Sequence, residues 1–197
     1  MQSIENTNNS ASVNDEYLQK VTVGELKLHN ATITLMEYDP HWPELFDREA
    51  NRIRSLLGSS VLQLEHVGST SIPGLCSKPI IDILLAVADS SDELSYVPAL
   101  EKAGYALRIR EPDWFEHRMF KGPDTNINLH VFSLGASEVK RMLRFRDWLR
   151  TNDTDRENYA RVKRDLAKHA WQNVQNYADA KTEIVKEIME RANSAEQ

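Results

Sequence analysis

The sequence has a single cysteine among its 197 residues, so it cannot form a disulfide within the chain. No stretch approaches the roughly 18 to 20 apolar residues of a membrane-spanning helix, which excludes that class of protein. The N-terminal residues contain no apolar run of the kind found in a secretory signal peptide. We therefore expect a cytoplasmic protein that makes no contact with membranes.

Basic charge is too scarce for a general nucleic-acid binder, because 24 Lys and Arg face 30 Asp and Glu and the net charge is −6. Residues 138–168 depart from this balance with ten basic and six acidic residues, so this part carries +4 and the remainder −10. Such a region is either a solvated helix face or a phosphate-binding surface. We expect a nucleotide or another phosphorylated small molecule as partner, with an RNA end as a second candidate.

One loop stands out between two segments that resemble strands. Residues 61–67 alternate apolar and polar side chains, and residues 80–87 are nearly all apolar. The loop between them contains two glycines, two prolines and several hydroxyls, and it ends at Lys78. Asp82 then interrupts the apolar segment, where a carboxylate must be paired or bound to a metal. Donors, a cation and a carboxylate this close together indicate phosphate or phosphate–metal chemistry.

The same loop carries a family resemblance. Residues 68–82 read Gly-Ser-Thr-Ser-Ile-Pro-Gly-Leu-Cys-Ser-Lys-Pro-Ile-Ile-Asp, and His66 precedes them. Further motifs are Tyr38-Asp39-Pro40-His41-Trp42-Pro43, Asn128-Leu129-His130-Val131, Phe145-Arg146-Asp147-Trp148-Leu149-Arg150 and Tyr159-Ala160-Arg161-Val162-Lys163. Over residues 32–190 this combination resembles the GrpB family, also designated UPF0157. That family occurs as a domain attached to some dephospho-CoA kinases and is grouped with the nucleotidyltransferase fold superfamily.

The resemblance implies an α/β (α+β) fold, a nucleotidyltransferase-like mixed sheet with flanking helices and a C-terminal helical part. Residues 1–30 are predicted to be a polar, partly disordered tail, and residues 31–197 a single domain. Thr154 and Glu157 have the spacing of a helix-capping box, and Pro98 must kink or split its helix. Periodicity and turn residues predict strands at 33–35, 61–67, 80–87, 105–110, 114–121 and 126–134, and helices at 43–57, 92–103, 137–150, 154–175 and 179–192.

The chemistry of the loop differs from that of a P-loop. Five residues separate its glycines instead of four, and Leu75-Cys76 stands where Lys-Ser/Thr is required, which argues against a Walker-type kinase. A nucleotidyltransferase, by the resemblance, has a Gly-Ser turn after one strand and acidic metal ligands on the next. Asp82 matches, but Leu84 replaces the second carboxylate and His130 falls near the third position. Either the metal differs from the usual one, or metal-dependent transfer has been lost.

Three residues are candidates for catalysis and for metal binding: Asp82, His66 and His130. Asp82 could orient one imidazole or share a metal with both, whereas the alternative is that the histidines are structural. The cofactor would be Mg²⁺ or Mn²⁺, or Zn²⁺ or Fe²⁺ if the histidines bind it. His117 and Glu116 are weaker candidates, because adjacent strand residues point to opposite faces.

Phosphate contacts are predicted in the loop and on the helices that follow. The loop hydroxyls either bind phosphate or merely close the loop through local hydrogen bonds. Two arginines four residues apart share a helix face, where they either grip an anion or pair with Asp147. The predicted ligand contacts are Gly68, Ser69, Thr70, Ser71, Lys78, Arg146, Arg150 and, secondarily, Lys163.

Three functions remain open at this point. The leading one is a phosphorylated-ligand binder that transfers a nucleotidyl group with the help of a metal. The second is an inactive module of the same fold that binds a ligand for regulation, and the third is a transition-metal-dependent hydrolase. Whether the chain is an enzyme, and its oligomeric state, cannot be read from these residues.

Overall fold

The structure is a computed structural model that describes residues 16–24, 33–169, 171 and 174–195. Residues 1–15 and 25–30 of the predicted tail lie outside the described residues. No helix in the described ranges is long and apolar enough to cross a membrane.

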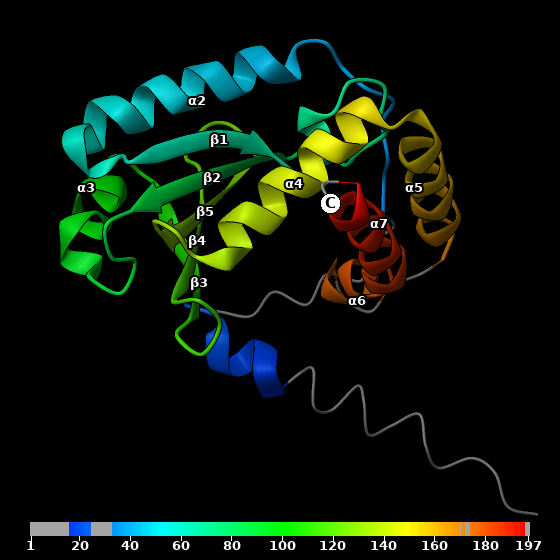
Figure 1. Cartoon of the computed structure of the whole chain (residues 1–197). Coiled ribbons are helices and arrows are strands. Elements are labelled where there is room, and N and C mark those ends of the chain that lie inside the picture. Colours follow the sequence, from blue (N-terminus) through cyan, green and yellow to red (C-terminus); the bar gives the residue numbers. More distant parts are fainter. Residues whose placement is uncertain (1–15, 25–32, 170, 172–173, 196–197) are drawn as a thin grey trace, which may run out of the picture.

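A five-stranded mixed sheet forms the centre of the molecule (Figure 1). Its order is β1-β2-β5-β4-β3, with β2 and β5 parallel and all other neighbours antiparallel. The predicted α/β class is confirmed, and the strands predicted at 114–121 and 126–134 pair as an antiparallel hairpin, β4 and β5. The strands are β1 Gln63–Val67, β2 Ile81–Val87, β3 Ala106–Glu111, β4 His117–Lys121 and β5 Ile127–Ser133.

The strand predicted at residues 33–35 is wrong. Only Met36 pairs, through two backbone hydrogen bonds of 2.8 Å with Ser77. Pro79 would oppose Thr34 in the next pair of this antiparallel ladder, and proline has no N–H to donate. The segment therefore runs irregularly along the loop instead of adding a strand.

Two helices cover one face of the sheet. Helix α2, Trp42–Leu57, has a proline in its first turn as predicted and buries Ala50 and Ile53 against the sheet. The helix predicted at 92–103 is split into a 3₁₀ turn, Glu93–Ser95, and α3, Val97–Lys102. Pro98 lies in the first turn of α3, where its missing N–H costs nothing.

The C-terminal part is helical, as predicted, and covers the other face (Figure 1). The predicted capping box at Thr154 is wrong, because Asn152 is the N-cap and accepts a 2.9 Å hydrogen bond from the Asp155 N–H. The predicted helix 154–175 also ends early, and a separate short helix precedes the last one. These helices are α4 Ser137–Thr151, α5 Asp153–Ala167, α6 Val174–Asp179 and α7 Thr182–Ser194.

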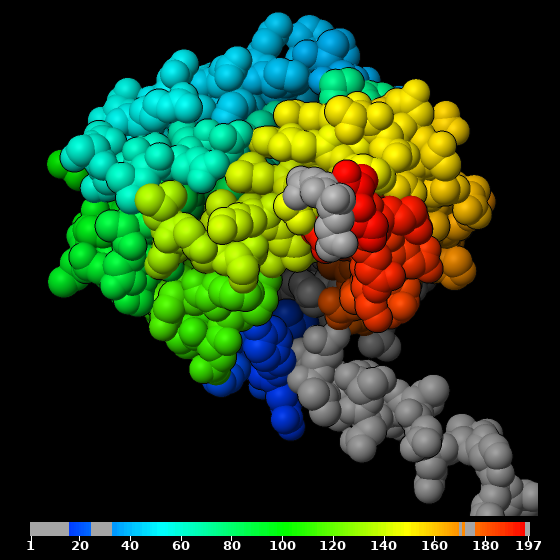
Figure 2. Space-filling view, viewed as in Figure 1, coloured from blue at the N-terminus to red at the C-terminus, as the bar shows by residue number. Residues whose placement is uncertain are grey.

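The alternation of side chains along each strand assigns them to one face or the other. Ile83 and Leu129 pack under α2, whereas Leu84 and Phe132 pack with Val139 of α4. Helices α4, α5 and α7 pack on one another and on the central loop, and Figure 2 shows α4 (yellow) beside α7 (red) on this side.

Residues 16–24 lie along the outer strand β3. Thr22 forms a bridge with Ile109, and the Val23 N–H donates to the carbonyl of Arg108 at 2.9 Å. Val21 is buried. This part of the predicted tail therefore packs on the sheet.

Candidate functional site

Strand register decides which predicted site residues meet. Asp82 pairs with Asn128 and Leu84 with His130, so Asp82 and His130 lie on the α4 face. His66 pairs with Ile83 and lies on the α2 face, where its ring stacks on Phe46 at 4.9 Å.

The shared His66–Asp82–His130 metal cluster is consequently not assembled, because residues one apart in register point to opposite faces. No group of three His, Cys, Asp or Glu side chains suited to a metal occurs among the described residues. The single cleft expected from the loop, Asp82, His130 and the two arginines likewise divides into two regions.

Asp82 packs directly against the glycine that ends β1. Gly68 has φ +67°, and a Cβ there would lie 2.3 Å from Asp82 Oδ2. Only glycine gives both this backbone conformation and this close approach. The Gly-Ser turn and the acidic strand residue are therefore held together by contact.

Hydrogen bonds and charges keep Asp82 ionised. Asn128 Nδ2 donates to Oδ1 at 2.7 Å, and His130 Nε2 lies 3.8 Å from the same oxygen. Burial alone raises the pKa of Asp82, but His130, Asn128 and Lys78 outweigh it, so the pKa is below its ordinary value. The carboxylate is partly exposed.

Four lysines lie within range of the charge of this carboxylate. Lys78 comes from the loop, Lys121 from the end of β4, Lys163 from α5 and Lys181 from the residue before α7. The negative charge of Asp82 acts on all four. Burial lowers the pKa of every one, to about 7 for Lys163 and about 8 for Lys181.

The lysines also repel one another, which lowers the pKa of Lys163 and Lys181 further. Four partly or fully buried cations beside one carboxylate leave an excess of positive charge. The region is called the Asp82 cluster below, and it consists of Asp82, Asn128, His130, Lys78, Lys121, Lys163 and Lys181.

Two tyrosines line the cluster. The Tyr177 ring lies 4.6 Å from Lys181 Nζ and 5.6 Å from Lys78 Nζ. Its hydroxyl is buried and has no hydrogen-bond partner in the described part of the chain, an arrangement that costs free energy unless a ligand or water occupies it. Tyr159 is buried and lies near Asp82, whose charge helps to raise its pKa.

Lys163 is 2% exposed, and its Nζ donates to the carbonyl of Cys76 at 2.5 Å. Its Nζ also lies 5.4 Å from the centre of the Tyr159 ring. Burial of an ammonium with so few acceptors is costly, which explains its low pKa.

The other loop hydroxyls already have partners within the chain. Thr70 Oγ1 bonds His66 Nε2 at 3.0 Å and donates to the carbonyl of Ile80 at 3.3 Å. Ser71 Oγ donates to the carbonyl of Gly68 at 2.6 Å. This geometry favours the loop-closing alternative for both, and their contact with a ligand stays a prediction.

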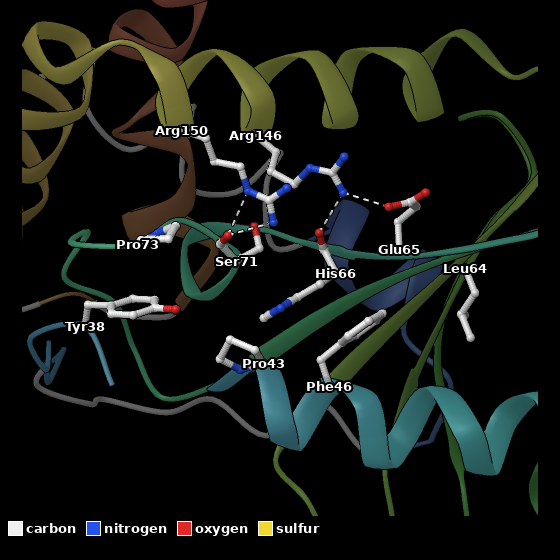
Figure 3. A pocket seen from close by; sticks show the side chains of 10 residues that line it. All are labelled: Tyr38, Pro43, Phe46, Leu64, Glu65, His66, Ser71, Pro73, Arg146 and Arg150. Carbon is white, nitrogen blue, oxygen red and sulfur yellow. Dashed lines mark hydrogen bonds and ion pairs between the residues drawn. The ribbon is translucent and has the colours of Figure 1, made fainter. Parts of the chain in front are cut away.

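A pocket of about 440 Å³ lies beyond the loop, between α2 and α4 (Figure 3). It is called the edge pocket below. Its lining is partly aromatic and partly charged, and it contains four of the predicted site residues. The lining residues are Tyr38, Pro43, Phe46, Leu64, Glu65, His66, Ser71, Pro73, Arg146 and Arg150.

Charges in the edge pocket are matched. Arg146 donates to Glu65 at 2.9 Å, to Asp147 at 2.7 Å and to the carbonyl of His66 at 3.0 Å. Arg150 donates twice to the carbonyl of Ser71, at 3.0 and 2.9 Å. The alternative in which Asp147 pairs with the arginines and fixes packing is therefore the one that the contacts favour.

His66 is neutral in this setting. Burial lowers the pKa of its imidazole to about 4, and the nearby arginines add to the effect. Its contacts are with Phe46 and Thr70.

Sequence reasoning missed Lys121, Lys181 and Tyr177. The register of the β4–β5 hairpin could have found Lys121, because it pairs with Asn128 and donates to Asn128 Oδ1 at 2.6 Å. No local signal could have found Lys181 or Tyr177, since only the packing of α6 and α7 brings them close.

The fold and this arrangement define an α/β protein whose central sheet carries a carboxylate surrounded by lysines. A family model described as "GrpB protein" matches residues 32–191. The chain belongs to the GrpB family. It is 72% identical to a UPF0157 protein of Halalkalibacterium halodurans over 98% of this chain and 100% of that one, and 44% identical to a UPF0157 protein of Streptomyces coelicolor over 83% and 86%.

Structural comparison gives the same family. The crystal structure of the conserved protein GrpB from Enterococcus faecalis is 31% identical, with a TM-score of 0.72 over 81% of this chain and 96% of that one.

A dephospho-CoA kinase of Mycolicibacterium paratuberculosis is 27% identical in sequence over 84% of this chain and 47% of its own length.

Proposed function

We propose that this chain binds a nucleotide or another phosphorylated small molecule at the Asp82 cluster. With a nucleoside triphosphate as ligand, it would transfer the nucleotidyl group to a hydroxyl, amine or phosphate acceptor and release pyrophosphate. The convergence of four lysines on one carboxylate carries the proposal. Phosphate oxygens would supply the negative charge that Lys163 and Lys181 lack, and would restore the ordinary pKa of both ammonium groups. Ser69 and Lys78 of the loop would bind the same phosphates.

A divalent cation fits this proposal only together with the ligand. Asp82 and His130 offer one carboxylate and one imidazole, and phosphate oxygens would complete the coordination. The cation would neutralise phosphate charge during transfer. With an imidazole in the set, Mn²⁺ suits these donors better than Mg²⁺.

A second candidate function is ligand binding without catalysis. Leu84, fully buried, occupies the position where a second carboxylate would hold the metal. A regulatory module would need the lysines to bind its ligand, but it would not need a second carboxylate at position 84. No contact in the described part of the chain favours the hydrolase alternative.

Calorimetric titration tests the proposal. The full chain is titrated with ATP, GTP, CTP, UTP and CoA, each with and without Mg²⁺ or Mn²⁺; CoA is included because one relative is named a dephospho-CoA kinase. We expect one triphosphate to bind in a metal-dependent way, and Asp82→Ala to abolish that dependence. Lys186→Gln, an exposed position on the helix that follows Lys181, is the matched control.

The outcomes separate the candidates. Mass spectrometry of the products of the bound triphosphate would show transfer. Binding that is indifferent to metal and to Asp82 supports the regulatory module, and absence of binding by all five compounds refutes both.

A further inference from the structure

A chain of hydrogen bonds runs across the α4 face of the sheet and ends at the Asp82 cluster. Glu111 Oε2 lies 2.6 Å from His117 Nδ1, and His117 Nε2 lies 3.0 Å from His130 Nδ1. His130 Nε2 is the remaining nitrogen, 3.8 Å from Asp82 Oδ1. Glu111 and His117 are opposite each other on β3 and β4, and His117 is two residues from Met119, the partner of His130.

Packing holds the middle of this chain in place. The His117 ring is buried and nearly parallel to the rings of His130 and Phe132. The distance between ring centroids is 5.2 Å to His130 and 4.7 Å to Phe132. The Trp114 ring lies perpendicular to the His117 ring, with 5.1 Å between the two ring centroids. At its outer end Glu111 also accepts a hydrogen bond from the Tyr17 hydroxyl of the N-terminal segment.

The order of donors and acceptors along the chain follows from Glu111. An ionised carboxylate can only accept, so His117 carries its proton on Nδ1. In a neutral imidazole the other nitrogen is then an acceptor, so His117 Nε2 accepts from His130. His130 therefore carries its proton on Nδ1, and in the neutral ring its Nε2 has a free lone pair. When Nε2 is protonated as well, it faces the Asp82 carboxylate and lowers the pKa of that group.

We propose that Glu111 and His117 are positioning residues that hold His130 in the Nδ1–H tautomer, with the Nε2 lone pair directed at the position beside Asp82. Histidine in water favours the opposite, Nε2–H tautomer, so the protein environment reverses the ordinary preference. The result is a nitrogen and an oxygen donor side by side. The consequence for cation binding rests on the proposed function, but the tautomer itself does not.

Nuclear magnetic resonance of the imidazole nitrogens measures the tautomer directly. The full chain, free of metal and ligand, is labelled with ¹⁵N and studied about two pH units above the ordinary histidine pKa of about 6.5. We expect His130 to show a protonated Nδ1 and a pyridine-like Nε2, and His117 to show the same pattern. A proton on Nε2 of His130 would overturn the proposal.

Two variants test the cause. His117→Phe keeps an aromatic ring in the stack but removes the acceptor, so His130 should revert toward the Nε2–H form. Glu111→Leu keeps a side chain of similar size but removes the acceptor, and should shift both histidines. An unchanged His130 in both variants would refute the positioning role, and Tyr17→Phe, which leaves Glu111 and His117 bonded, is the control expected to change nothing.

Cation binding supplies a separate readout. In Mn²⁺ titrations of the triphosphate complex, His117→Phe should lower the affinity for Mn²⁺ by about 10- to 100-fold. This is the usual effect of removing a residue that hydrogen-bonds to a metal ligand. If no metal or triphosphate binds the wild type, the proposed function fails while the tautomer result stands. If His117→Phe does not fold, Glu111→Leu gives the same test.

Discussion

The Asp82 cluster and the edge pocket lie on either side of the same loop, but their charges are handled in opposite ways. In the edge pocket, Arg146 and Arg150 make ion pairs and hydrogen bonds to neighbouring carboxylates and carbonyls. In the Asp82 cluster, the charge of Asp82 acts on four lysines, Asp179 also acts on Lys181, and burial lowers the pKa of all four. The arginines of the first region bond to carboxylates and carbonyls, although burial and Arg146 lower the pKa of Arg150, whereas the lysines of the second region have fewer anionic partners among the described residues.

This difference shows which region is built for a ligand. Matched arginines contribute to folding and need no partner from outside. Buried lysines without enough anions destabilise the free protein, and such sites persist where function requires them. Most arginines of the basic segment predicted to bind phosphate thus serve packing, while lysines from four different elements provide the candidate site.

The largest effect should come from removing cations in the Asp82 cluster. Lys163→Met combined with Lys181→Met should weaken triphosphate binding by at least about 100-fold, since hydrogen bonds between charged groups contribute about 1.5–3 kcal/mol each. Calorimetry measures the affinity. Lys163→Met alone should also raise the free energy of unfolding by about 1 kcal/mol, because it removes a poorly solvated buried charge.

The opposite outcome would mean that both regions stabilise the fold and that neither is specialised for a ligand. A loss of stability with unchanged affinity would make these lysines structural, and the exposed control Lys186→Gln should alter neither quantity.

Arg146→Met should lower the stability of the fold without changing the affinity for triphosphate. Loss of the guanidinium leaves Glu65 without its partner, and we expect the free energy of unfolding to fall by about 2 kcal/mol in urea titrations. Triphosphate affinity of the folded protein should stay within about two-fold of the wild type. A fall in affinity comparable to that of the lysine variants would instead place the edge pocket in the binding site.

Protonation of His66 should weaken the fold in mild acid. Its pKa is about 4 in the folded protein and about 6.5 when unfolded, so the unfolded state binds more protons between these values. The free energy of unfolding should therefore fall by about 2 kcal/mol as the pH drops from about 6.5 to about 4. Urea unfolding across this window should show a shallower fall in His66→Phe, and the exposed His169→Gln should match the wild type.

Two glycines separate backbone strain from site geometry. Gly68→Ala and Gly74→Ala both place a side chain at a positive φ, +67° and +77°, at a cost of about 1–3 kcal/mol each. Only the first places a Cβ on Asp82, whereas the second meets nothing nearer than Arg156 Nε at 3.9 Å. Gly68→Ala should additionally reduce metal-dependent binding about ten-fold, a figure that corresponds to 1.4 kcal/mol. Equal binding by the two variants would contradict a site built on Asp82.

Local sequence patterns determined much of this protein. Alternation and apolar runs predicted the five strands of the sheet and the hairpin, and Pro98 marked the break in its helix. The loop motif identified the family, and the glycine before Ser69 was correctly placed beside the acidic strand. Each of these depends on residues close together in the chain, where backbone sterics and side-chain periodicity act.

Tertiary structure alone decided the composition of the site. His66 pairs with Ile83, the residue after Asp82, so its side chain lies on the opposite face of the sheet from Asp82 and His130. The packing of separate helices brought in Lys181 and Tyr177, and pairing across strands joined His117 to His130. These contacts join distant parts of the chain, and no local pattern encodes them because they depend on how whole elements pack.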